Sequence, residues 1–195
     1  NIMPGMLGSL SIIQIMLLAA LSVAREREQG TFDQMLVTPL SPWEILIGKA
    51  IPPVVVGIAQ ASLVLLVCLF WFDIPFAGSF ADLYIALGVF TLSCAGLGLC
   101  ISAISLNMQQ ALVYCFVVLL PMVLLSGLAT PVSAMPEAMQ IATCANPLRF
   151  ALVCIRSVYL EGATLCDIAP NFVPMLAVAA VTLPLAGWLF RNRLS

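Results

Sequence analysis

The sequence has no histidine and few charged residues. Charged side chains make up 8% of its 195 residues, against roughly 25% in an average soluble domain, while hydrophobic residues make up 63% and the mean hydropathy is +1.14. A net charge of -2 that rests on so few groups gives no sign of nucleic-acid binding. The composition is that of an integral membrane protein, so the lipid bilayer is its first partner.

The seven cysteines lack the spacing of a metal or redox site. There is no CxxC pair, and without histidine there can be no Cys/His ligand set. We therefore favour a packing role for these side chains and expect no metal and no cofactor in this chain. A disulfide among Cys144, Cys154 and Cys166 stays open if their segment faces an oxidising compartment.

The sequence also lacks the parts of an ATPase or an intramembrane enzyme. The phosphate-binding pattern G-x-x-x-x-G-K-[ST] is absent. Gly48-Lys49 is followed by Ala50 instead of serine or threonine, and Trp43 stands where the first glycine would have to be. No Ser/His, paired-acid or metal-ligand set lies at membrane depth, and no buried acid could serve a proton relay. The acids nearest the spans stand at their ends, at Asp73, Asp82 and Asp167.

What the chain does contain is long uncharged stretches. A helix needs about 20 apolar residues to cross the hydrocarbon core, and residues 1–24, 50–72 and 168–190 each supply one such helix. Residues 83–136 are too long for one helix and must double back near residues 107–110. We predict an all-α, polytopic membrane helix bundle with five crossings, at residues 4–24, 50–72, 82–105, 111–128 and 172–190.

Basic residues near the span ends predict the orientation, because they are enriched in cytoplasmic loops. Five fall on one side, namely Arg25, Arg27, Lys49, Arg191 and Arg193, and only Arg149 and Arg156 fall on the other. We therefore expect a periplasmic N-terminus for this sequence and a cytoplasmic C-terminus. We identify no cleaved signal peptide before the first apolar run and expect the sequence to be a fragment of a longer chain. A complete chain with a cytoplasmic start needs an odd number of further crossings upstream, most simply one, which makes six.

Between the fourth and fifth crossings, residues 129–171 predict short outer helices. The apolar run 148–160 is too short to span and carries two arginines, so it should lie on the outer surface or dip into it. Proline and glycine commonly interrupt helices, so we expect the segment to be divided into short helical pieces at Pro131, Pro136, Pro147 and Gly162.

Residues 25–49 form a polar island that holds seven of the sixteen charged residues. Within residues 26–37, Phe32, Met35 and Leu36 lie at i, i+3 and i+4 and predict a short amphipathic helix, which Gly30 weakens and Pro39 stops. The helix could lie on lipid without a partner, but its polar face is mixed in sign, which favours docking to a protein.

The next residues carry strong signals for a helix start. Ser41 is a suitable N-cap, Pro42 fits the first helical position, and Glu44 completes a capping box. The new helix leads directly into the second crossing, with Trp43 suited to the headgroup level.

The third crossing contains small residues at close spacing, with Gly98 and Ser102 four apart. Such residues allow two helices to pack closely in a tight seam, for example at a dimer interface. The alternative is that they reflect only the ordinary enrichment of glycine in membrane helices.

Two separated parts of the chain resemble the permeases of ABC-2 type transporters, particularly the multidrug-export branch. The stretch from Glu26 to Ser41, continuing to Glu44 and Gly48-Lys49, resembles their cytoplasmic loop. Their outer segment before the last crossing is matched by Ser126-Gly127-Leu128, Pro131, Met135-Pro136, Asn146-Pro147-Leu148-Arg149 and Arg156. The two matches occur in the family's order and cover nearly the whole chain, without the first crossing and any large outer domain.

This resemblance implies a permease subunit of an ATP-driven exporter in a bacterial inner membrane. It implies a second permease subunit, as homodimer or heterodimer, and separate ATPase subunits that bind ATP and magnesium; it leaves room for a periplasmic adaptor. The exported substrate would be amphiphilic and drug-like. Alternatives are an exporter of lipid or lipid-linked glycan, or a membrane assembly scaffold that transports nothing.

The resemblance also assigns roles to residues. Contact with the ATPase falls to a coupling segment whose matching residues are Glu26, Arg27, Glu28, Gly30, Thr31, Phe32, Asp33, Gln34, Leu36, Thr38 and Pro39. The outer helices that cap the translocation path would include Pro131, Pro136, Pro147, Arg149 and Arg156. No residue is assigned to substrate binding.

Overall fold

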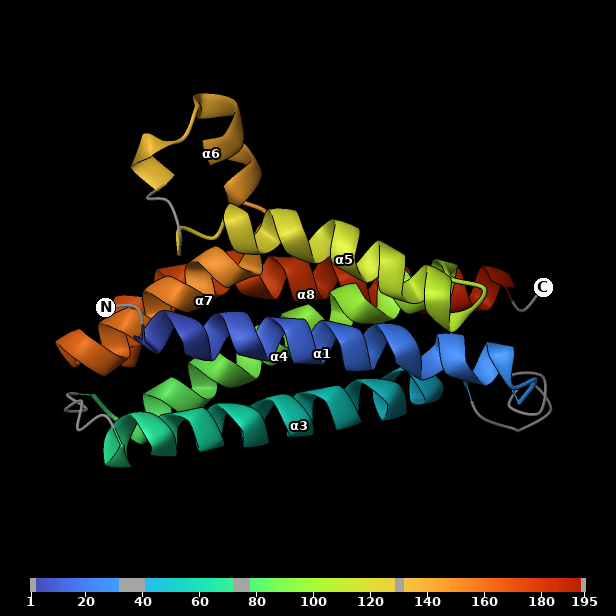
Figure 1. Ribbon diagram of the computed structural model, residues 1–195, viewed down its shortest axis with the longest axis horizontal. Coiled ribbons are helices and arrows are strands. Elements are labelled where there is room, and N and C mark those ends of the chain that lie inside the picture. The colour runs from blue at the N-terminus through green and yellow to red at the C-terminus, as the bar shows by residue number, and fades with distance from the viewer. Residues whose placement is uncertain (1–2, 32–40, 72–77, 129–131, 194–195) are drawn as a thin grey trace.

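The computed structural model describes residues 3–31, 41–71, 78–128 and 132–193. In these ranges the chain is helical and contains no strand, which confirms the predicted all-α fold. The long helices lie lengthwise beside one another, and the two chain ends lie at opposite ends of the bundle (Figure 1). They are α1 (Met3–Glu28), α3 (Pro42–Phe70), α4 (Phe80–Ile104), α5 (Met108–Leu124) and α8 (Leu165–Arg193).

Four of the five predicted crossings correspond to helices that are long and apolar enough to span a membrane, namely α1, α3, α4 and α8. The fifth, predicted at residues 111–128, is α5, which has only 17 residues. The Leu125 amide makes the last α-helical bond, to the Pro121 carbonyl. The Ser126 amide then bonds to the Val123 carbonyl three residues back, and Gly127 turns into the left-handed region at φ +85°, which ends the helix. At about 1.5 Å per residue α5 is about 25 Å long, shorter than the hydrocarbon core.

After α5 the chain leaves the bundle and returns. Helix α6 (Glu137–Thr143) projects from the side of the bundle, whereas α7 (Pro147–Arg156) lies back against it (Figure 1). A single π turn, η2 (Ser157–Glu161), extends α7, and α6 meets the combined run Pro147–Glu161 at an angle of 78°. The bend separates run 148–160 from α6, and α7 packs deep in the bundle: Leu148, Ala151 and Ile155 have at most 1% of their surface exposed. That this run lies on the outer surface or dips into it stays a prediction.

Asn146 fixes the bend between α6 and α7. Its side-chain amide donates to the Met122 carbonyl of α5 at 2.7 Å, and its side-chain oxygen accepts from the Leu148 amide at 3.0 Å. One side chain therefore caps α7 and attaches it to α5.

The last helix begins seven residues before the predicted crossing at residue 172. Thr164 and Asp167 form the start, since the Asp167 carboxylate accepts from both the Thr164 amide, at 3.0 Å, and its hydroxyl, at 2.9 Å. The end of the predicted outer segment, residues 165–171, therefore belongs to α8. The Thr-x-x-Asp pattern at residues 164–167 is a local signal for this start that the prediction of a crossing from residue 172 did not use.

Helix α4 lies in the middle of the bundle, packed against α1, α3, α7 and α8. At Gly98 the contact with α1 is so close that an added Cβ would lie 2.5 Å from Ala19 Cβ and 2.9 Å from the Met16 carbonyl oxygen. The Ser102 hydroxyl, one turn further, accepts from the Val23 and Ala24 amides at 3.1 and 3.2 Å. The tight seam is thus confirmed but lies within one chain, because α1 and not a second subunit covers it.

Candidate functional site

The polar end of α1 differs from the prediction in how its helix ends. Arg25 to Glu28 complete α1 instead of starting a separate amphipathic helix. Gly30 then takes a left-handed conformation at φ +72°, its amide bonds to the Arg27 carbonyl, and the Thr31 amide bonds to the Glu26 carbonyl. This pair of bonds is a Schellman motif. Gly30 therefore stops the first span rather than weakening a helix, a role that its position after a basic last turn indicates.

Glu26 connects α1 to α3. Its carboxylate Oε1 lies 2.5 Å from Lys49 Nζ, and the two side chains are only 28% and 14% exposed. A partly buried pair is screened less by salt than a surface pair, so this contact holds α3 to α1 more firmly than an exposed ion pair would.

Arg27 connects α1 to the end of α4. Its Nη1 donates to the Ser105 carbonyl at 2.9 Å, and Ser105 is the C-cap residue of α4. A guanidinium at a helix C-terminus satisfies a carbonyl that has no partner within the helix and complements the negative end of the helix dipole.

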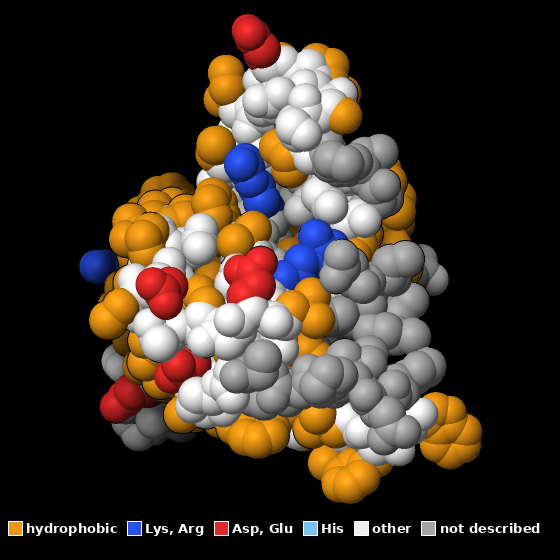
Figure 2. Space-filling model, turned by 90° about the vertical axis from the view of Figure 1, so that its left-hand side faces the viewer, with side chains coloured by type: hydrophobic (Ala, Val, Ile, Leu, Met, Phe, Trp, Pro, Cys, Tyr) orange, Lys and Arg blue, Asp and Glu red, His pale blue; other side chains and the backbone are white. Residues whose placement is uncertain are grey.

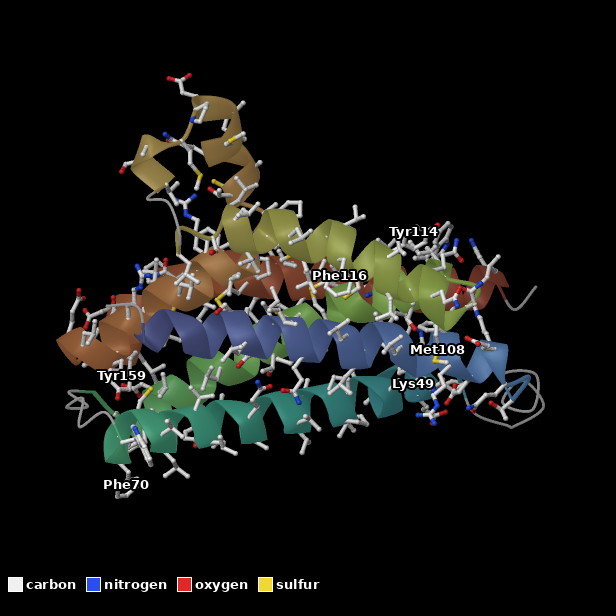
Figure 3. The ribbon with its side chains drawn as sticks, viewed as in Figure 1. Lys49, Phe70, Met108, Tyr114, Phe116 and Tyr159 are labelled. Atoms are coloured by element: carbon white, nitrogen blue, oxygen red, sulfur yellow. The ribbon has the colours of Figure 1, made fainter. Side chains whose placement is uncertain are left out.

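Glu28 connects α1 to the start of α5. Its Oε2 accepts from the Met108 amide at 3.0 Å, and Met108 is the first residue of that helix. The N-cap residue Asn107 accepts from the Gln110 amide, so two of the free amides of α5 are satisfied here. Lys49 and Met108 lie beside the charged end of α1, from α3 and α5 respectively (Figure 3).

Three consecutive charged residues of α1 therefore contact three different helices. Consecutive side chains of an α-helix are separated by about 100°, so Glu26, Arg27 and Glu28 spread around the end of α1. The sequence singled out these three residues but not their partners Lys49, Ser105 and Met108. The opposite charges of Glu26 and Lys49 are a sequence signal that is compatible with their pairing. The partners of Arg27 and Glu28 are backbone groups, which give no signal in the sequence.

The helix start after the island is confirmed. The Ser41 amide donates to Glu44 Oε2 at 2.7 Å, the Glu44 amide donates to Ser41 Oγ at 3.4 Å, and Pro42 occupies the first helical position. The remaining predicted coupling residues lie outside the described ranges, namely Phe32, Asp33, Gln34, Leu36, Thr38 and Pro39.

The predicted outer residues lie on the excursion between α5 and α8. Pro136 is the N-cap of α6, Pro147 begins α7, and Arg149 and Arg156 both belong to α7. Pro131 lies outside the described ranges. The structure thus places the two arginines on one helix, far from the charged end of α1.

The described residues contain no cluster of three or more histidine, cysteine, aspartate or glutamate side chains that could hold a metal ion. All seven cysteines fall within these residues and are free thiols. The disulfide left open for Cys144, Cys154 and Cys166 is therefore not formed; Cys154 is buried while the other two are exposed.

At the charged end of α1, Glu26, Arg27 and Glu28 thus connect four helices of the bundle. The family model described as ABC-2 type transporter matches residues 1–160. The chain belongs to the ABC-2 type transporter family. This confirms the resemblance that the two polar segments indicated.

Several permeases are similar to this ABC-2 chain over nearly its full length. The probable multidrug ABC transporter permease YbhR of Escherichia coli K12 is 40% identical over 192 residues, which is 98% of this chain and 52% of that protein. The probable multidrug ABC transporter permease YbhS of the same strain is 31% identical over 193 residues, 98% of this chain and 51% of that protein. The linearmycin resistance permease protein LnrN of Bacillus subtilis is 27% identical over 173 residues, 89% and 45% of the two chains. This chain thus spans about half the length of the curated relatives it matches.

Proposed function

We propose that this chain is the membrane part of a permease subunit that exports an amphiphilic, drug-like substrate across a bacterial inner membrane. Separate ATPase subunits, which bind ATP and magnesium, supply the energy, and a second permease subunit completes the path. Membership of the ABC-2 family and the similarity to probable multidrug permeases support this proposal.

The observation that carries the proposal is the charged end of α1. A segment of residues 32–40 joins this end to the capped start of α3, and we propose that the ATPase contacts it. Because Glu26, Arg27 and Glu28 hold α3, α4 and α5, a displacement imposed on the segment would move four helices together. Charge-assisted hydrogen bonds are about twice as strong as neutral ones, which suits a junction that transmits motion.

This end faces the cytoplasm in our proposal. Arg25, Arg27 and Lys49 gather there, and the C-terminal end of α8 with Arg191 and Arg193 lies at the same end (Figure 1). Arg149 and Arg156 lie on α7 towards the other end. This distribution agrees with the positive-inside rule and supports a periplasmic location for the excursion of α6 and α7.

The replacement Glu28→Gln tests the proposal, because it removes the charge at the α5 N-terminus and keeps the side-chain size. A hydrogen bond to a charged group contributes about 1.5–3 kcal/mol, so we expect roughly tenfold less substrate transported per ATP hydrolysed. The measurement uses the full-length permease with its copurified ATPase in proteoliposomes, with ATP hydrolysis and substrate transport followed together.

Glu137→Gln is the matched control, since Glu137 lies at the start of the projecting α6 and should leave coupling unchanged. Equal coupling in both variants would contradict the role of the α1 end. Failure to recover an ATPase, or ATP hydrolysis that no substrate stimulates, would favour the non-transporting scaffold.

A further inference from the structure

A hollow of about 360 Å³ lies between the end of α5 and one face of α7. Its polar lining comes from Arg149, Arg156 and Ser126, and its apolar lining includes Val153 and Leu152. Viewed from the end of the molecule far from the C-terminus, Figure 2 shows basic side chains gathered at the foot of the projecting segment.

Helix α7 presents both arginines on one face. Arg149, Val153 and Arg156 are spaced at i, i+4 and i+7, which places them on one side of a helix. The opposite side, with Leu148, Ala151 and Ile155, is fully buried in the bundle. The two arginine Cα atoms are separated by about 10.5 Å of helical rise, so a ligand between them can be reached by both side chains.

Arg149 is held in position by neutral groups. Its Nη1 donates to the Thr143 hydroxyl, and its guanidinium carbon lies 5.6 Å from the centre of the Phe150 ring. These contacts orient the side chain but do not neutralise its charge. Among the described residues, no carboxylate lies within 4 Å of it.

Arg156 is the less satisfied of the two. Its Nε is buried and has no hydrogen-bond partner among the described residues, and no described carboxylate forms an ion pair with it. The guanidinium lies close to α1, since a Cβ added at Gly5 would come within 3.5 Å of its Nη2. The Arg156 side chain is half-buried, so part of its guanidinium is removed from water without an ion-pair partner, and a bound anion would stabilise it.

The chemistry of the lining identifies the class of ligand. Guanidinium groups bind carboxylate and phosphate oxygens through paired hydrogen bonds, and Ser126 adds a hydroxyl group. Leu152 and Val153, the latter 43% exposed, provide an apolar wall beside the charges. We propose that this pocket binds the oxyanion headgroup, a phosphate or carboxylate, of a membrane-borne amphiphile. The lining of the pocket carries this inference independently of the proposed export function.

The test measures the affinity of the full-length protein, in neutral detergent and without ATP, for decyl phosphate. Decyltrimethylammonium has the same chain with the opposite charge, and inorganic phosphate lacks the chain. We expect decyl phosphate to bind most tightly, and Arg156→Gln and Arg149→Gln each to weaken it at least tenfold. Arg156→Lys should retain part of the affinity, because it keeps the charge but loses the paired geometry.

Arg191→Gln is the matched control, since it removes an arginine at the other end of the molecule and should bind like the wild type. Equal binding of decyl phosphate by all variants, or equal binding of the cationic amphiphile, would overturn the proposal. Inorganic phosphate binding as tightly as decyl phosphate would overturn its amphiphile part. The unliganded thermal midpoints of the variants establish that each is folded.

A second measurement identifies the source of the headgroup. Phosphatidylglycerol in nanodiscs, compared with phosphatidylcholine, should displace decyl phosphate if a bilayer lipid occupies the pocket. Binding of decyl phosphate unaffected by phosphatidylglycerol would assign the pocket to a transported anionic amphiphile. Both results retain the oxyanion chemistry. Because ATP takes no part, loss of ATP coupling in the Glu28 variant and loss of binding here remain separate results.

Discussion

Replacing Gly98 with alanine should separate α1 from α4. The added Cβ would lie 2.5 Å from Ala19 Cβ, 2.9 Å from the Met16 carbonyl oxygen and 3.3 Å from the Ala20 amide nitrogen. Carbon atoms in contact are normally about 3.5–4.0 Å apart, so the helices must move apart by about 1 Å at this point. Two of the three atoms belong to the backbone of α1 and cannot turn away.

The cost of this shift has three parts. Overpacking a well-packed core typically costs about 1–3 kcal/mol. The shift would also stretch the Ser102 hydrogen bonds to the Val23 and Ala24 amides, now 3.1 and 3.2 Å, and a hydrogen bond between membrane helices averages about 0.6 kcal/mol. The better helix propensity of alanine returns about 1 kcal/mol. We therefore expect a net loss of about 1–3 kcal/mol.

The same helix offers the control Gly88→Ala, because nothing lies within 4 Å of a Cβ added at Gly88. This variant should be as stable as the wild type or up to about 1 kcal/mol more stable. Reversible unfolding of the full-length protein by sodium dodecyl sulfate in mixed micelles measures both free energies. Equal stability of the two variants would refute the close α1–α4 seam.

Two further predictions concern other contacts in the bundle. In a double-mutant cycle of Glu26→Gln and Lys49→Gln, we expect a coupling free energy of roughly 1–2 kcal/mol, because both side chains are largely buried. Exposed pairs typically give about 0.2–1 kcal/mol, and additive effects in the same unfolding assay would show that the pair contributes nothing. Asn146→Ala should destabilise the protein by about 1–3 kcal/mol, since it leaves the buried Leu148 amide without its capping oxygen and the Met122 carbonyl without its donor. Hydrogen exchange should become faster at the start of α7 but not in α3, and unchanged exchange at α7 would contradict this cap.

Signals in the sequence were reliable where they were local. Ser41, Pro42 and Glu44 predicted the start of α3 to the residue, because a capping box depends on only four consecutive positions. The same type of signal at Thr164 and Asp167 marks the true start of α8, seven residues before the start predicted at residue 172. Gly30 was given the wrong role, since the sequence does not state whether a glycine lies within a helix or just beyond its end.

By itself the sequence determined that this is a multi-pass, all-helical membrane protein of the ABC-2 type. The lengths of its hydrophobic stretches and its short polar motifs are local features that can be identified without knowing how the helices pack. Only the tertiary structure decided that Gly98 packs against α1 of the same chain, that Glu26, Arg27 and Glu28 hold three different helices, and that Arg149 and Arg156 share a pocket. These contacts join residues far apart in the sequence, often through backbone groups. A backbone amide or carbonyl is the same at every position, so its choice of partner is settled only when the helices pack.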